Sequence, residues 1–153
     1  MATKNDTKAT ADDAAEVATI DSGAQGVGIP DWSAGYTSIK GTDFATRKRV
    51  AQALTNAESL ADHLGKTLEV VDIVTVPITV ESREGTGEVN DDVRFHLLLK
   101  DGTVLAASGS GIRNSMTNIF MSMGDPSGWP EPLTVKATEA RTSKGRFYRL
   151  EIV

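Results

Sequence analysis

The longest strand-like run in the chain, KTLEVVDIVTVPITVES at residues 66–82, places the strongest constraint on the fold. The run is rich in β-branched residues, which favour strands over helices. Because most strands are only about five or six residues long, a strand of this length usually bends. Pro77 marks a bend or an edge position, since proline cannot donate a backbone hydrogen bond. The run therefore predicts a long, curved first strand of a β domain.

Four further strands and one helix are predicted after this run. VRFHLLLK at 93–100 is alternating and then apolar, and Asp101-Gly102 predicts a tight turn into a third strand at 104–108. GSGIRNSMTNIFMSMG at 109–124 carries apolar residues at helical spacing and ends in glycine. The fourth and fifth strands are predicted at 133–142 and 146–153, and REGTGEVNDD at 83–92 is predicted to be a hairpin loop.

The predicted order is β-β-β-α-β-β, with a long first strand and a helix between the third and fourth strands. This is the element order of the OB-fold, a five-stranded Greek-key barrel that binds oligonucleotides on its second and third strands and neighbouring loops. An SH3-like barrel is the nearest alternative, but a substantial helix at this place favours the OB-fold. We therefore predict a mainly β protein with an OB-fold barrel.

Two segments precede the predicted barrel, which spans residues 66–153. Residues 1–41 contain few branched apolar residues and are predicted to be a flexible acidic arm, although Trp32 and Tyr36 would be able to fix part of it to the domain. Residues 42–65 are predicted to form an amphipathic helix, capped by Thr42 or Asp43, that docks on the barrel.

The residue types exclude several classes of protein. The chain has no cysteine and only two histidines, so neither a disulfide framework nor a thiolate metal site is available. Glu88, Asp91 and Asp92 match no calcium-loop spacing, and the serines lack a His-Asp arrangement. We therefore predict no enzyme activity, no catalytic residue, no metal and no cofactor.

No run approaches the roughly 18 apolar residues of a membrane span, and the N-terminus lacks the apolar core of a signal peptide. A soluble, cytoplasmic protein with no membrane partner is expected.

The acidic character of the chain is unevenly distributed. The net charge is −5, but residues 1–112 carry 17 acidic against 10 basic side chains, whereas residues 113–153 carry 4 acidic against 6 basic ones. Because a ligand meets the local charge rather than the sum, a basic surface is compatible with this composition.

Alternation along the strands separates the predicted core side chains from the outward ones. On the second strand the core set is Val93, Phe95, Leu97 and Leu99, and the outward set is Arg94, His96, Leu98 and Lys100. On the fourth strand Leu133, Val135 and Ala137 face inward and Lys136 outward, and on the fifth Tyr148, Leu150 and Ile152 face opposite to Phe147, Arg149 and Glu151.

The outward cations and aromatics indicate a surface for single-stranded nucleic acid. Cations pair with phosphates, and an aromatic ring stacks under any base, which gives sequence-tolerant binding. Phe147 is the predicted stacking platform and His96 a possible second one. The alternative is an ordinary polar barrel face, with Phe147 buried under the helix at 42–65. The predicted DNA-binding residues are Arg94, His96, Lys136, Arg141, Lys144, Arg146, Phe147 and Arg149.

Two other residues have open interpretations. Trp129, between Pro126 and Pro130, is expected to plug the barrel rather than stack on a base. Arg113, near the start of the second helix, opposes the helix dipole, so it points toward a phosphate or lies in solvent.

Residues 64–153 resemble the small single-stranded DNA-binding proteins that bacteriophages encode. The resemblance is carried by TLEVVDIVTVPITV, VRFHLLLKDGTVLAASGSGI and SMTNIFMSMGDPSGWPEPLTVKATEARTSKGRFYRLEIV, in this order. It implies an OB-type fold that coats single strands during replication or recombination, without catalysis, in the cytoplasm of the infected host. In many single-stranded DNA-binding proteins the acidic segment follows the barrel, whereas here it precedes the barrel.

These observations leave two main hypotheses. The first is a sequence-tolerant single-stranded DNA-binding protein that acts as a homo-oligomer or cooperative array and recruits replication or recombination proteins through the acidic arm. The second is a non-catalytic β-barrel adaptor or structural protein that binds another protein through that arm. An accessory subunit of an enzyme is a third possibility.

Overall fold

Strand β3 (Thr67–Glu81) organises the sheet, because it pairs along both halves of its length. In this computed structural model, which describes residues 28–81, 85 and 87–153, its first residues pair with β6 (Leu133–Thr142). From Val70 to Glu81 it pairs with β4 (Val89–Leu99), and the register shifts between Val70 and Asp72. The predicted long first strand is therefore present, and one strand joins two antiparallel partners. The other strands of the barrel are β5 (Val104–Ser108) and β7 (Gly145–Ile152).

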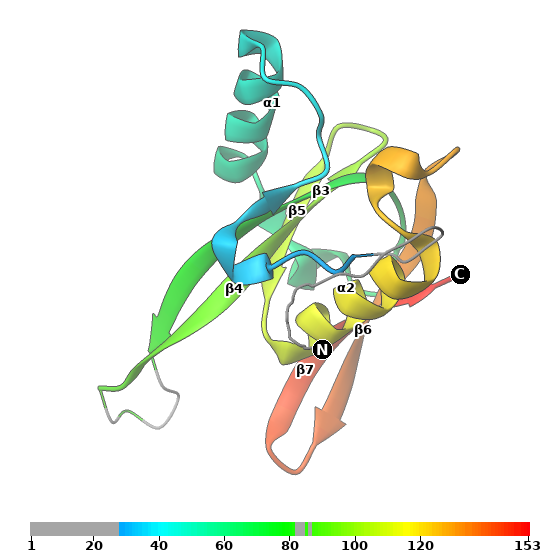
Figure 1. Cartoon of the computed structure of the whole chain (residues 1–153). Coiled ribbons are helices and arrows are strands. Elements are labelled where there is room, and N and C mark those ends of the chain that lie inside the picture. The colour runs from blue at the N-terminus through cyan, green and yellow to red at the C-terminus, as the bar shows by residue number, and fades with distance from the viewer. Residues whose placement is uncertain (1–27, 82–84, 86) are drawn as a thin grey trace, which may run out of the picture.

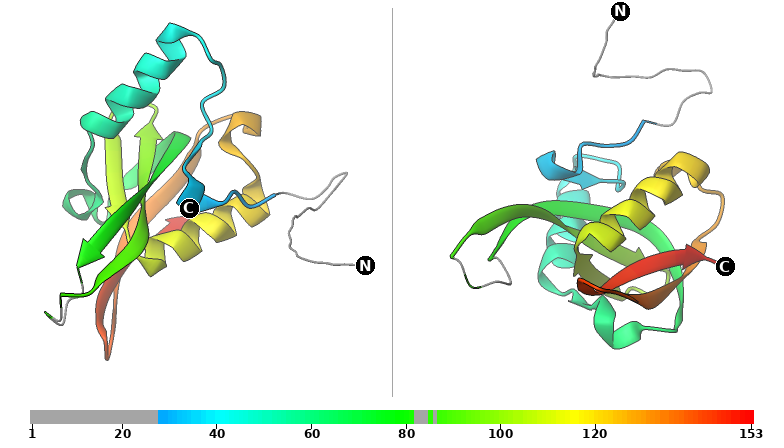
Figure 2. Two further views of the ribbon diagram at one scale, coloured as in Figure 1. Left: turned by 60° about the vertical axis from the view of Figure 1, so that its left-hand side comes forward. Right: turned by 90° about the horizontal axis from the view of Figure 1, so that it is seen from below.

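The strand order is β2-β5-β4-β3-β6-β7, with β1 (Tyr36–Thr37) paired to β3 and β2 (Glu58–Ser59) parallel to β5. β3, β4 and β5 follow one another, and β6 returns beside β3, which is the Greek-key arrangement. Figure 2 shows the sheet curling around helix α2 (Ser110–Met123) into a half-barrel. This OB-like barrel, with its helix between the third and fourth barrel strands, confirms the predicted fold class.

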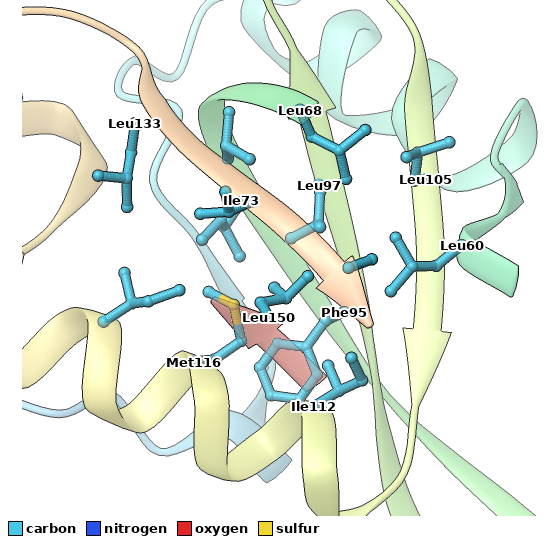
Figure 3. Packing of buried hydrophobic residues seen from close by; sticks show 14 of the residues in the cluster. Leu60, Leu68, Ile73, Phe95, Leu97, Leu105, Ile112, Met116, Leu133 and Leu150 are labelled. Atoms are coloured by element: carbon cyan, nitrogen blue, oxygen red, sulfur yellow. The ribbon is translucent and has the colours of Figure 1, made fainter. Parts of the chain in front are cut away.

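The core lies between the inner face of the curled sheet and α2 (Figure 3). The predicted alternation is confirmed, since Phe95 and Leu97 on β4 and Val135 on β6 are at most 2% exposed. On β7, Leu150 is buried, whereas Ile152 on the same face is 47% exposed at the end of the strand. From α2, the buried side chains facing this core are Ile112, Met116, Ile119 and Phe120.

Helix α2 also lies against the free edge of β7. The backbone N–H of Leu150 donates to the Ser115 hydroxyl oxygen at 3.0 Å, and that hydroxyl donates to the Gly111 carbonyl at 2.9 Å. A side chain at Gly111 would place its Cβ less than 3.0 Å from the Tyr148 carbonyl oxygen and from the Phe147 ring. Glycine is therefore required for this close approach.

The described part of the predicted arm, residues 28–41, packs on the barrel, while residues 1–27 lie outside the described residues. The Trp32 side chain is 7% exposed, and its ring centroid lies 4.9 Å from that of Phe120. The Tyr36 hydroxyl donates to an Asp125 carboxylate oxygen. Because a large aromatic buries roughly 150–250 Å², two such residues hold this segment despite its polar composition. Packing on the barrel thus begins before the boundary predicted at residue 41.

Helix α1 (Phe44–Thr55) is shorter than the helix predicted at 42–65. Its start agrees with the prediction, because the Asp43 carboxylate accepts the Thr46 N–H at 3.1 Å. The chain leaves the helix after Thr55 and forms β2 and a 3₁₀ turn, Leu60–His63, so that Leu60 becomes 1% exposed in the barrel core. Burial of this leucine outweighs the helical periodicity that continued beyond residue 55.

Strand β4 begins earlier than predicted. Residues 89–92 were expected in the hairpin loop, but they pair with Ile78–Glu81 of β3. The β-branched end of β3 supplies a regular partner edge, so the hairpin continues despite the acidic residues. Of the predicted loop, residues 83, 84 and 86 lie outside the described residues, as does residue 82 before it.

The two hairpins, β3–β4 and β6–β7, extend at one end of the molecule, and α1 lies at the other end (Figure 1). Two short 3₁₀ turns, Trp32–Ala34 and Pro126–Gly128, flank the core. Within the described ranges, no helix has the length and apolar character needed to cross a membrane.

Replacing Gly111 tests the packing of α2 on β7. Alanine favours a helix over glycine by about 1 kcal/mol, but overpacking typically costs about 1–3 kcal/mol. Because the Tyr148 carbonyl belongs to the backbone and cannot move aside easily, we expect Gly111→Ala to lower the free energy of unfolding in urea denaturation. Gly128→Ala is the control, since a Cβ there has no atom within 4 Å. A Gly111→Ala protein as stable as the wild type would contradict the close packing.

Candidate nucleic-acid interface

A groove of about 1050 Å³ opens where the outer face of β4 and β5 meets three other segments. These segments are the chain from the end of α1 to the 3₁₀ turn at Leu60–His63, the start of α2, and the β6–β7 turn with the beginning of β7. We call this space the groove. It is lined by Leu54, Thr55, Ala57, Glu58, Ser59, Ala61, Arg94, His96, Ala106–Gly111, Thr142 and Lys144–Tyr148.

Strand pairing explains why Arg94 and His96 face the groove. They alternate with the buried Val93, Phe95 and Leu97, and they lie opposite Ser108 and Ala106 of β5 in the sheet register. Directly paired residues project from the same face of a sheet. The side chains of Arg94 and His96 therefore both project from the outer face of β4 into the lining of the groove.

The outer face of β4 is not open along its whole length. Leu98 faces outward from the barrel core, as predicted, but it is only 6% exposed because it packs with Ile39, Ala53 and Val74 in a second apolar cluster. Helix α1 and the segment before it cover this part of the sheet. The sequence predicted a helix docked on the barrel, but it did not indicate that this helix would cover Leu98.

The β6–β7 hairpin brings Lys144, Arg146 and Phe147 to the groove. Phe147 is half-buried, and its ring lies next to Gly111 at the start of α2 rather than beneath α1. Arg146 is 62% exposed and lies 3.4 Å from a Glu139 carboxylate oxygen. An exposed pair of this kind contributes about 0–1 kcal/mol, so a phosphate competes readily for this guanidinium.

The other three predicted DNA-binding residues lie on the same hairpin outside the groove. Lys136 and Arg149 share the outer face with Phe147, and Arg149 forms an ion pair with Glu151 at 3.2 Å. Arg141 is exposed and lies directly opposite Arg146. The structure thus brings five of the eight predicted residues to the groove and leaves Lys136, Arg141 and Arg149 beside it.

His96 is buried in the lining of the groove. Its side chain is 2% exposed, so its ring is closed to the base stacking considered above. Burial lowers the pKa of His96 below 6.5, the Val74 backbone opposes this shift, and the nearby charge of Arg94 adds to it. Within the described residues its Nδ1 atom is buried without a hydrogen-bond partner. The imidazole is therefore neutral near pH 7.

The groove is basic although the chain is acidic. Its charged lining residues are Arg94, Lys144, Arg146 and Glu58, and a Glu58 carboxylate oxygen lies 2.9 Å from the His63 Nε2 atom. Neither Arg94 nor Lys144 forms an ion pair within residues 28–81, 85 and 87–153. Three cations against one carboxylate favour a polyanion here.

Other candidates have structural partners. The Arg113 side chain is 42% exposed, and its guanidinium lies 3.4 Å from an Asp92 carboxylate oxygen, so it reaches solvent but has an acidic neighbour. Trp129 packs against the core, as predicted, and its indole N–H donates to the Met123 carbonyl at 2.9 Å. Among the residues that the structure describes, no group of His, Asp and Glu side chains is arranged to hold a metal ion.

The sequence analysis missed the contributions of residues 54–61 and 109–111 to the groove. The first segment was assigned to a helix, and the second was considered only as part of α2. The available signal was the Gly-Ser-Gly sequence at 109–111, which begins a helix without a capping side chain.

The family model described as phage single-stranded DNA-binding protein matches residues 34–152 of the chain. The chain belongs to this family. The match includes every residue that lines the groove, and it confirms the resemblance found in the sequence. Neither a curated protein nor a solved structure matches the chain. The phage single-stranded DNA-binding protein family thus gives the chain its general function, the binding of single-stranded DNA.

The buried neutral His96 predicts a pH-dependent stability. Between its ordinary pKa of 6.5 and its lowered folded-state pKa, the unfolded chain binds a proton at this residue and the folded chain does not. Stability therefore falls as the pH drops through 6.5, until the folded-state pKa is reached. We expect His96→Gln to flatten this part of the pH profile in urea denaturation between about pH 5 and pH 7.5. His63→Gln is the control, and equal slopes in the wild type and His96→Gln would contradict the assignment.

Proposed function

We propose that this phage single-stranded DNA-binding protein coats single strands, with little regard to sequence, while phage DNA is replicated or recombined, and that the groove is the path of the strand. The supporting observation is the position of the groove on β4 and β5 beside the β6–β7 turn. OB-folds bind oligonucleotides on their second and third strands and on the loop between the fourth and fifth. The groove occupies this same face.

The side chains in the groove fit a sequence-tolerant mode of binding. Arg94, Lys144 and Arg146 offer positive charge to phosphates, which are present at every nucleotide whatever its base. Phe147 offers a half-buried ring to a base, and stacking contributes about 1–3 kcal/mol per base whatever its identity. This role requires no catalytic step and no cofactor.

Lys136, Arg141 and Arg149 extend the proposed path along the hairpin. Lys136 and Arg149 share the outer face with Phe147, so a strand that leaves the groove over Phe147 meets them next. Removing these charges one at a time while measuring single-strand affinity tests this extension. Unchanged affinity in all three variants would confine the path to the groove.

The proposal is tested by titrating fluorescent oligo-dT with the protein at two salt concentrations, with duplex DNA as competitor. Coating predicts tight binding that weakens steeply with salt and that duplex DNA does not displace. Absence of binding at low salt by a folded sample would favour the alternative of a protein-binding adaptor.

The stacking role of Phe147 predicts separate effects of two substitutions. Phe147→Ala is expected to weaken oligo-dT binding by about 1–3 kcal/mol. Phe147→Leu keeps much of the apolar contact with α2 but has no aromatic ring, so it should lose affinity while retaining the wild-type melting temperature. If Phe147→Leu binds like the wild type, the ring has a packing role only.

The charge of Arg146 predicts a change in salt dependence. We expect Arg146→Gln to lower affinity equally for different sequences and to reduce the slope of log K against log salt by about 0.7, the value for one phosphate contact on a single strand. Lys66→Gln is the control, since it removes the same charge from an exposed position outside the groove. A sequence-dependent loss in Arg146→Gln would contradict coating.

Recruitment of replication or recombination proteins by the acidic arm, and self-association on the strand, are further parts of the proposal. Recruitment by the arm is motivated by the five acidic and two basic side chains within residues 1–27. A deletion that tests the arm must stop before Gly28, because Trp32 belongs to the core. Deleting residues 2–27 without any change in partner binding or in self-association would remove this part of the proposal.

A further inference from the structure

Helix α1 exposes most of its surface to solvent. Of its 12 residues only Ala53 is buried, and Thr46 and Val50 are partly covered. The helix packs on the sheet through this one side, where Ala53 and Val50 join the second apolar cluster. Figure 1 shows α1 projecting from the body of the molecule, with its start at the outer tip. Within the described part of the chain, the opposite side of α1 is therefore an open surface.

The open side of α1 has a regular pattern. Residues three or four apart lie on the same side of a helix, and on this side every one of them is exposed. They comprise an aromatic ring, two cations and four-residue-spaced small or apolar side chains. In chain order they are Phe44, Arg47, Lys48, Ala51, Leu54 and Thr55. We call these residues the α1 face.

The α1 face is continuous with the groove. Its last two residues, Leu54 and Thr55, belong to the groove lining. Because a helix rises about 1.5 Å per residue, Phe44 lies about 16 Å farther along the axis than Thr55. A strand that leaves the groove past Leu54 therefore meets Ala51 first, then the two cations and finally the ring of Phe44.

The two cations of the α1 face are available to a polyanion. Arg47 and Lys48 are exposed, and neither forms an ion pair in the part of the chain that the structure describes. Arg49, on the other side of the helix, lies 2.9 Å from an Asp72 carboxylate oxygen. The 12 residues of α1 include no acidic side chain, and the Asp43 carboxylate before them caps the helix. The charge of this face therefore matches the phosphates of a single strand.

The stability of the fold does not explain Phe44 or Arg47. Phe44 is 73% exposed, so little of its apolar surface contributes to the core. Arg47 lies in the first turn of α1, where a cation opposes the helix dipole. An exposed aromatic ring beside cations is the combination with which proteins hold single strands, because the ring stacks on bases and the cations meet phosphates.

We propose that the α1 face is a second contact surface for the single strand, on which Phe44 stacks on a base and Arg47 and Lys48 meet phosphates. This inference rests on the proposed function, because it assumes that the strand follows the groove as far as Leu54. It makes the binding site longer than the barrel. The groove holds one part of the strand, and α1 holds the next part.

Oligo-dT of increasing length tests the α1 face, because only a strand longer than the groove reaches Phe44. OB-fold sites cover about 4–16 nucleotides, so the series starts at about 4 and extends beyond 16. Phe44→Ala should bind the shortest oligomers like the wild type and the longest ones roughly 5-fold to 150-fold more weakly, the range for one stacked base. Its melting temperature should not fall, since alanine favours a helix. Wild-type affinity at every length would overturn the proposal.

Met121→Ala is the matched control for Phe44→Ala. Met121 is 64% exposed on α2 and lies outside the groove, so its replacement also removes an exposed apolar side chain from a helix. The control should bind every length of oligo-dT like the wild type. Equal losses in the two variants would overturn the proposal, because they would show a general effect of exposed apolar area.

The double variant Arg47→Gln, Lys48→Gln tests the charges. For long oligo-dT it should reduce the slope of log K against log salt by about 0.7 for each phosphate contact, and for the shortest oligomers it should leave the slope unchanged. The double variant Lys66→Gln, Lys100→Gln is the control, since both lysines are exposed outside the groove and outside α1. The same reduction in the control, or for the shortest oligomers, would overturn the proposal.

Phe44→Trp reports the contact directly. The indole retains an aromatic ring for stacking, so affinity should be retained. Its fluorescence should change with long oligo-dT but not with the shortest oligomers, beyond the change in the wild type, which contains Trp32 and Trp129. No additional change with long oligo-dT would overturn the proposal.

These measurements separate the α1 face from the proposed function. If oligo-dT of all lengths binds to the wild type and the variants of α1 have no effect, the proposed function stands and the α1 face fails. If Phe147→Leu binds like the wild type while Phe44→Ala weakens the binding of long oligo-dT, stacking in the groove fails and the α1 face stands. Absence of oligo-dT binding at every length would overturn both.

Discussion

The contact between α2 and the edge of β7 holds the barrel and the groove together. In the described sheet β5 and β7 are its outer barrel strands and are not paired with each other. The seam is instead covered by α2, whose Ser115 hydroxyl accepts the Leu150 N–H and whose Gly111 lies against Tyr148. Without a side chain at Gly111, the helix comes close enough to satisfy part of an otherwise open edge. The same approach brings the start of α2, Phe147 and the outer face of β4 into one space.

The N-terminal segment decides which part of the sheet remains open. The outer face of β4 is continuous from Arg94 to Leu98, but Ile39 and α1 cover Leu98 while the groove begins at His96. The covered part of β4 is apolar at Leu98, and the open part carries the cation Arg94. The boundary between the covered and open parts therefore follows the polarity of the β4 side chains. An acidic chain thus presents a basic groove, since most of its acidic side chains belong to other segments.

Much of the barrel was predictable because each strand carries its own signal. Alternation around Phe95 and Val135 identified the inner faces, and Asp101-Gly102 identified a turn, from neighbouring residues alone.

The end of α1 was not predictable in this way, because Ala57, Ala61 and Leu64 continue a helical spacing that the structure does not use. Leu60, which lies outside that spacing, enters the barrel core instead, and only the assembled core reveals the reason. Of the five predicted site residues that line the groove, Arg94, His96 and Phe147 follow from alternation, whereas Lys144 and Arg146 come from the β6–β7 turn and the start of β7.

His96 shows where local rules and tertiary structure conflict. Alternation assigns it correctly to the outer face, but the end of α1 and β2 close over that face, and a polar ring becomes buried among Val74, Leu98 and Ala106. Leaving a buried polar atom unpaired costs about 1–3 kcal/mol, so an apolar residue would stabilise the empty fold better.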